Sequence, residues 1–336
     1  MTRSIPHVIR RLAVVSTILL VFLFCCLAAG ISVGSSGTKL FAVLQGQLSG
    51  DKADPLLATI VWQVRFPRVL LAALVGATLS LGGLVFQALL RNPLAEPYIL
   101  GISGGAAIGA IIGILLDLSR FPGVTFTAFA GSAGTLLLLL VMTAGQSAVQ
   151  KDSLLLSGVM VNAFCTAFIM FLVSITQDSR LHNIIFWLMG DMGMTDLHQV
   201  ALLAAILAPC FVLFFLLSNA MNLLSMGPET AQAMGIPVKM VSVLLLVTTS
   251  VMISAAVSYC GLIGFVGLVM PHLLRLVLGP DHRILVPACV LGGGGYLVLC
   301  DLLARALPRQ GEMPAGVITA LIGAPLFVYL LKTSKL

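Results

Sequence analysis

The stretch from residue 65 to residue 113 constrains the fold of this chain more than any other. It consists of two apolar runs of about twenty residues each, separated by a polar segment at residues 91–95. In water, both runs would have to be buried on every side around a loop rich in proline and asparagine. In a bilayer they fit well, because about 20 apolar residues cross a hydrocarbon core of about 30 Å. The stretch therefore predicts two membrane helices joined by a short polar turn.

Glycine recurs at every fourth position of the second run, at Gly101, Gly105, Gly109 and Gly113. This spacing puts the four residues on one face of a helix. A glycine face lets another backbone come close where lipid gives no hydrophobic drive for association. We expect this face to be a helix-packing interface; generic glycine, which is common in membrane helices, is the alternative.

Composition supports a membrane protein. The chain of 336 residues is 59% hydrophobic and 9% charged, with a mean hydropathy of +1.12, whereas globular proteins carry about a quarter charged residues. The net charge of +6 comes from 18 basic residues spread among apolar runs, so nucleic acid is not an expected partner. The seven cysteines include no Cys-x-x-Cys pair. We interpret them as packing residues, with a disulfide or metal role as the alternative.

Apolar runs long enough to cross a membrane recur along the whole chain. They predict an all-α polytopic membrane protein, a single transmembrane domain over residues 1–336 with ten transmembrane helices. A cleaved signal peptide is the alternative for the first run, and the segment at 176–199 has room for a short interfacial helix. The runs lie at about residues 12–32, 66–90, 98–116, 123–144, 154–175, 199–219, 238–257, 261–279, 284–303 and 314–332.

The charge distribution predicts the orientation. An even number of spans puts both termini on one side, and lysines and arginines at both ends favour the cytoplasm. In that topology the inner segments hold ten Lys and Arg against four acids, and the outer segments hold eight of each sign. This small excess favours a multi-pass protein of the cell inner membrane with both termini cytoplasmic.

Motifs for catalysis or metal binding do not stand out. The sequence contains no His-Glu-x-x-His and no Gly-Lys dipeptide, and the phosphate-binding P-loop requires the latter. We therefore expect no cofactor in this chain; ATP and magnesium would be bound by a partner ATPase. Glycine and proline breaks at residues 92–94, 261–267 and 292–295 are tolerated at membrane depth only where protein or a water-filled cavity satisfies the backbone. This pattern favours one half of a transporter.

A set of motifs occurs in order from about residue 60 to the C-terminus. They are Arg65-Phe-Pro-Arg68, Gln87, Arg91-Asn92-Pro93-Leu94-Ala95, Pro97, Leu100-Gly101-Ile102-Ser103-Gly104-Gly105-Ala106, Gly264-Phe265-Val266-Gly267-Leu268-Val269, Pro271-His272, Arg275, Glu312-Met313-Pro314-Ala315-Gly316-Val317 and Gly323-Ala324-Pro325-Leu326-Phe327. Together they resemble the FecCD-type permeases, which are the membrane subunits of type II ABC importers for siderophores, heme and cobalamin. The resemblance implies the ten-span fold of that family.

The resemblance implies a docking site on the outer face. Permeases of this family receive cargo from a soluble binding protein whose surface glutamates pair with arginines, and Arg65, Arg68 and Arg305 match those positions. Three fixed cations near an outer rim suit an acidic partner. Ordinary anchoring of helix ends is the alternative, and Arg309 lies near enough in the sequence to share the task.

The resemblance also implies a cytoplasmic coupling loop at about residues 222–240, which would sit in a groove of the ATPase subunit. A Gly-Pro-Glu-Thr start and a later Gly-x-Pro predict a short helix there. The residues concerned are Met226, Gly227, Pro228, Glu229, Ala231 and Gly235.

A cytoplasmic gate is implied at two further segments. One contains Asn92 and Leu94, and the other contains Gln150 and Asp152. The second segment departs from the small hydroxyl residues of the family pattern, and Asn92 is also suited to cap the next helix. We interpret His272 as a packing residue or a partner for backbone; a metal or heme ligand next to Met270 is the alternative.

These observations predict a permease that does no covalent chemistry. It would form a dimer, most simply a homodimer, with two cytoplasmic ATPase subunits and a soluble substrate-binding protein. An iron siderophore is the expected cargo, with heme or cobalamin as alternatives. Two other classes stay open: a secondary transporter driven by an ion gradient, for which Asp301 is the nearest mid-span acid, and a non-transporting receptor or scaffold.

Overall fold

The computed structural model describes residues 5–33, 59–143, 151–308 and 311–333. Seven helices in these ranges are long and apolar enough to cross a membrane, and three shorter apolar helices accompany them. Each coincides with one predicted span, so the predicted fold class is confirmed. The ten are α1 (Ile5–Ser32), α4 (Phe66–Leu90), α5 (Ile102–Leu115), α6 (Thr125–Thr143), α7 (Lys151–Ser174), α9 (Leu197–Leu216), α12 (Val238–Cys260), α13 (Val266–Leu278), α14 (His282–Ala306) and α15 (Ala315–Thr333).

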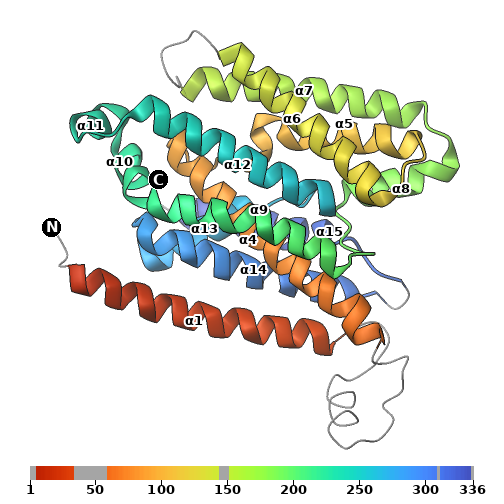
Figure 1. The fold of residues 1–336 in the computed structure, drawn as a ribbon, viewed down its shortest axis with the longest axis horizontal. Helices are drawn as coiled ribbons and strands as arrows, with labels where there is room; N and C mark the ends of the chain where they lie inside the picture. The colour runs from red at the N-terminus through yellow and green to blue at the C-terminus, as the bar shows by residue number, and fades with distance from the viewer. Residues whose placement is uncertain (1–4, 34–58, 144–150, 309–310, 334–336) are drawn as a thin grey trace, which may run out of the picture.

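Three further α-helices are short, and three single-turn segments, Ile60–Arg65, Pro97–Leu100 and Arg120–Val124, form π- or 3-10 helices. Helix α8 (Asp178–Leu188) lies in the segment where a short helix had room to form. Helices α10 (Ser218–Met226) and α11 (Pro228–Ala233) form the connection between α9 and α12. Figure 1 shows α10 and α11 at one end of the bundle and α8 at the opposite end.

Helix α4 forms the centre of the bundle. In its most apolar window 83% of the residues are buried, against 6% in α1, which lies along the edge beside α14 (Figure 1). Small residues let the neighbours of α4 approach closely: a Cβ at Gly76 would stand 2.3 Å from the Gly293 carbonyl oxygen of α14, and a Cβ at Gly83 only 1.8 Å from the Gly267 oxygen of α13. Backbone-to-backbone contact of this kind is how membrane helices associate.

The glycine face of α5 packs on α6. A Cβ at Gly105 would stand 2.5 Å from the Gly131 oxygen, and one at Gly109 would stand 2.0 Å from the Thr127 oxygen. Gly113 also faces α6, whereas Gly101 does not: it caps the start of α5 with φ of 77° and lies against Val161 of α7. The expectation that all four share one interface is therefore corrected for Gly101, because a residue before the first turn does not follow the helical period.

Two of the membrane helices are short. Helices α5 and α13 have 14 and 13 residues, which makes each about 20 Å long, less than the hydrocarbon core of about 30 Å. Residues 261–265 before α13 are non-helical, and before α5 the non-helical residues 91–96 are followed by a 3-10 helix, Pro97–Leu100. Two of the three predicted breaks thus lie where these short helices begin. The third, at residues 292–295, is wrong: these glycines lie inside the continuous helix α14, where their small size lets α4 and α1 pack closely.

Candidate functional site

The arginines expected at the outer rim gather where α4 begins and α14 ends. Asp301 of α14 lies between two of them, with Oδ1 accepting from Arg68 Nε at 2.9 Å and Oδ2 accepting from Arg305 Nε at 2.9 Å. Asp301 is completely buried, and Arg68 and Arg305 are 7% and 2% exposed. Glu312 adds a second carboxylate, which accepts from Arg68 Nη1. We call Arg65, Arg68, Asp301, Arg305 and Glu312 the arginine cluster.

The arginine cluster also holds the C-terminal end of α1. Arg305 donates to the carbonyl oxygens of Gly30 at 3.0 Å and Val33 at 3.1 Å, and Arg65 donates to Ile31 at 3.3 Å. The last carbonyls of a helix have no partner within the helix and carry partial negative charge. Guanidinium groups therefore stabilise this helix end, which joins α1 to α4 and α14.

The three arginines of this cluster are buried. The sequence predicts cations near an outer rim, and Arg65, Arg68 and Arg305 are all at most 7% exposed. The reason is that a charged group at this depth is stable only when opposite charges or dipoles surround it, and Asp301, Glu312 and the carbonyls of α1 supply them. Docking of a binding protein at these residues stays a prediction. Arg309 lies outside the described residues.

Asp301 has a different environment from the one expected of an ion-coupling acid. Both of its oxygens are taken by guanidinium groups, and its burial is complete. The geometry is that of a structural ion pair rather than of a site open to an ion pathway. The spacing of Asp301 and Arg305, four residues apart on one helix, was the signal in the sequence that could have predicted the pair.

The predicted coupling loop forms two short helices joined at Gly227, which has φ of 124°. Helix α11 begins at Pro228, with Glu229 in its first turn, and Gly235 follows its end with φ of 84°, as the turn residues predict. Ala231 is buried, whereas Met226 and Met234 are 69% and 66% exposed. Exposed methionines suit a contact with a partner, since their side chains adapt to its shape.

An apolar groove runs beside α11. Its volume is about 990 Å³, and it lies between α11 and the first turns of α12, with the exposed side chain of Met240 in its lining. Its lining includes Pro228, Gln232, Ile236, Met240, Val243 and Val247.

A polar cluster attaches α10 to the start of α14. Asp281 accepts from Asn222 Nδ2 at 3.0 Å and pairs with Arg283 at 2.7 Å, and Asn222 Oδ1 accepts from the His282 backbone N–H at 2.9 Å. Burial opposes ionisation of Asp281, but the hydrogen bonds from Arg283 and Asn222 outweigh it and lower the pKa of this carboxyl to about 2. The cluster fixes the base from which α11 projects.

Of the predicted gate residues, the structure describes Asn92 and Leu94 in full. Arg91 ends α4 with φ of 50°, and Asn92 Oδ1 accepts from the Leu94 N–H at 2.9 Å. Asn92 therefore closes its own turn rather than capping the next helix. Gln150 lies outside the described residues, and Asp152 lies in the first turn of α7, where its side chain is not described. Gating by these residues stays a prediction.

The segments that precede α5 and α13 contact each other through hydrogen bonds. The Tyr98 hydroxyl donates to the Ile263 oxygen at 2.7 Å and accepts from the Ile263 N–H at 2.8 Å, while Glu96 Oε1 accepts from the Phe265 N–H at 2.8 Å. Phe265 is the N-cap of α13, with φ of 68°. The freed backbone is thus satisfied by side chains from the segment that follows the gate turn. These partners are 165 to 169 residues apart in the sequence, and no local pattern predicts them.

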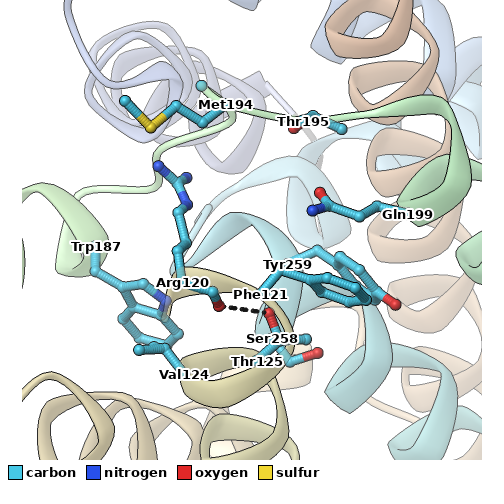
Figure 2. Close-up of a pocket in the computed structure, with 11 residues that line it drawn as sticks. Arg120, Phe121, Val124, Thr125, Trp187, Met194, Thr195, Gln199, Ser258 and Tyr259 are labelled. Atoms are coloured by element: carbon cyan, nitrogen blue, oxygen red, sulfur yellow. Dashed lines mark hydrogen bonds between the residues drawn. The ribbon is translucent and has the colours of Figure 1, made fainter. Parts of the chain in front are cut away.

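A small pocket opens near the start of α6. It has a volume of about 240 Å³ and lies between the aromatic side chains of Phe121, Trp187 and Tyr259. Figure 2 shows the Arg120 guanidinium pointing toward the segment that carries Met194. Arg120 is paired with Asp191 at 2.8 Å, so the charge of the arginine is already balanced.

Within the described ranges, no three His, Cys, Asp or Glu residues come together as metal ligands. His272 is buried, and neither ring nitrogen has a hydrogen-bond partner among the described groups. The interpretation of His272 as a partner for backbone is therefore wrong, whereas its interpretation as a packing residue fits.

Comparison with known proteins agrees with this architecture. The ABC transporter permease protein YvrB of Bacillus subtilis is 37% identical over 323 residues, which cover 92% of this chain and 91% of the relative. The vitamin B12 import system permease protein BtuC of Salmonella arizonae is 39% identical over 285 residues, 85% of this chain and 86% of the relative. An inward-facing metal-chelate type ABC transporter has the same fold, with a TM-score of 0.84 and 31% identity over 94% of this chain and 98% of the other.

A more distant structure, PsaBC from Streptococcus pneumoniae, shares the fold with a TM-score of 0.58 and 18% identity, covering 87% of this chain and 96% of that chain. The FecCD transport family itself is matched over residues 18–333. The match takes in all the motifs on which the resemblance was based. The chain belongs to the FecCD transport family of ABC importer permeases.

Proposed function

We propose that this chain is the permease of an importer for a large metal chelate. Two copies would form the pathway between them, two cytoplasmic ATPase subunits would drive it, and a soluble binding protein would deliver the cargo. The observation that carries the proposal is the fold match to a metal-chelate type ABC transporter along 94% of the chain. The relatives named above are permeases as well.

Three metal chelates are candidates for the cargo. The sequence predicts an iron siderophore, with heme or cobalamin as alternatives. The vitamin B12 permeases among the relatives, at 37–39% identity, favour cobalamin as a second candidate. All three are bulky chelates that hold a metal within an organic shell, so the pathway would select for size and apolar surface while the binding protein selects for chemistry.

The chain's own contribution is mechanical. ATP binding at the partner would move α11, and the polar cluster around Asp281 would pass that movement to α14. The contacts of Glu96 and Tyr98 with the start of α13 would link the gate turn to the same bundle. Such a subunit works by changing the populations of outward-open and inward-open states, which the partner biases.

Uptake into proteoliposomes tests the proposal. Permease and ATPase are reconstituted with ATP on the cytoplasmic side, and a candidate binding protein is loaded in turn with a labelled iron siderophore, heme or cobalamin. We expect ATP-dependent accumulation of one chelate and none of the others. Accumulation that requires an ion gradient instead of ATP would contradict the proposal.

A further inference from the structure

The two carboxylates on Arg68 differ sharply in their surroundings. Asp301 is completely buried, and each of its oxygens accepts from a different arginine. The Glu312 side chain is 41% exposed and contacts Arg68 from the surface of the arginine cluster. Asp301 is therefore a fixed partner, whereas Glu312 is a partner that solvent, or another protein, can reach.

The backbone around Glu312 lets its side chain leave without other changes. Glu312 follows Gly311, which has φ of 74°, and precedes Met313, whose N–H donates to the Ala304 oxygen at 3.1 Å. That bond fixes the segment between α14 and α15 directly after Glu312. Rotation about the side-chain bonds of Glu312 is enough to withdraw its carboxylate, and α15 stays in place.

The charges of the arginine cluster make an exchange favourable. Three arginines face two carboxylates, which leaves a net charge of +1, and Arg65 also interacts electrostatically with Glu312. Withdrawal of Glu312 without replacement would raise the local charge to +2 and leave Arg68 with one carboxylate. Replacement by an incoming carboxylate keeps the balance, and it avoids the cost of a buried guanidinium that lacks a partner.

We propose that Glu312 is a displaceable internal carboxylate: it occupies Arg68 while the permease is undocked, and an acidic side chain of the binding protein takes its place on docking. This inference rests on the proposed docking at the arginine cluster. It gives Arg68 a partner at every stage. It also makes docking weaker than it would be on an unoccupied arginine, which suits a partner that must leave after delivery.

The test compares two variants that change the charge equally. Glu312→Gln removes the carboxylate from Arg68, and Asp117→Asn removes one from Arg180. Asp117 follows α5, its side chain is 72% exposed, and the predicted topology puts it on the same side of the membrane. Both variants raise the net charge by one and release an arginine, but only the first acts on Arg68. The complete transporter, in lipid nanodiscs, is titrated with a candidate soluble metal-chelate binding protein from the same organism.

We expect Glu312→Gln to lower the Kd about three- to five-fold, the size of effect that loss of one competing surface ion pair produces. Asp117→Asn should leave the Kd within a factor of about 1.5, since exposed charges at a distance are screened by salt. If the two variants changed the Kd equally, or if Glu312→Gln raised it, the inference about Glu312 would be wrong, although the proposed docking would still hold. If the unaltered transporter bound none of the candidate proteins under any salt condition, the proposed docking would fail, and the inference with it.

Discussion

Replacement of Asp301 tests whether the arginine cluster holds the bundle together. Asp301→Asn keeps the size of the side chain but removes the charge between Arg68 and Arg305. Removing one partner of a buried ion pair costs about 3–5 kcal/mol, because the remaining charge is left without compensation. Arg68 keeps Glu312, and Arg305 keeps the carbonyls of α1. We therefore expect a loss near the lower limit, about 3 kcal/mol.

Chemical unfolding in detergent micelles measures this loss. Tryptophan fluorescence follows the unfolding; of the two tryptophans, Trp62 lies one turn before Arg65, and Trp187 is buried in the bundle. Asp117→Asn serves as a control, because it breaks a solvent-exposed pair that contributes about 0–1 kcal/mol. If Asp301→Asn and Asp117→Asn lost the same free energy of unfolding, the cluster would not stabilise the bundle. Asp301→Asn combined with Arg305→Gln should cost less than the sum of the single changes, since each already breaks the shared bond.

Three further predictions concern helix packing, the dependence of stability on pH, and the hydrogen bonds between Tyr98 and Ile263. Gly83→Ala should lower the free energy of unfolding by about 1–3 kcal/mol, because its Cβ would stand 1.8 Å from a backbone oxygen of α13, whereas Gly134→Ala, with open space around its Cβ, should have little effect in the same unfolding assay. The pKa of Asp281 is about 2 in the folded protein against about 3.9 unfolded. Its contribution of about 2–3 kcal/mol to stability is therefore present above about pH 4 and lost as the pH falls through about 2, so the free energies of unfolding of the unaltered protein and of Asp281→Asn should converge over that interval in an acid titration. Tyr98→Phe removes both hydrogen bonds to Ile263 and should cost about 1–3 kcal/mol; hydrogen exchange at the start of α13 should rise, and unchanged exchange would contradict the role given to Tyr98.

The sequence predicted the spans well for a physical reason. A hydrocarbon core requires about 20 apolar residues per helix, so the apolar runs mark the helices directly, and all ten runs have a helix in the described chain. The turn residues around Pro228 and Gly235 likewise determine α11 locally. Local chemistry was enough for both features.

The arginine cluster and the contact of Glu96 and Tyr98 with the segment before α13 could be predicted far less well. Arg68 and Asp301 are 233 residues apart, and Glu96 and Phe265 are 169 apart. In the sequence, each of these residues resembles an ordinary charged residue or turn residue, because its partner lies far away along the chain. Only the four-residue spacing of Asp301 and Arg305 carried a local signal. Contacts between distant segments depend on tertiary packing, which periodicity does not encode.

ATP hydrolysis by the reconstituted complex tests the central claim most directly. A binding protein loaded with the chelate is added to permease and ATPase in liposomes. The variants are Met234→Glu, directly after α11, and Met194→Glu at the opposite end of the bundle, a matched pair of exposed methionines. The account predicts that loaded binding protein stimulates hydrolysis, that Met234→Glu abolishes the stimulation and that Met194→Glu preserves it. Stimulation that survives Met234→Glu, or hydrolysis that never responds to the loaded binding protein, would contradict the account.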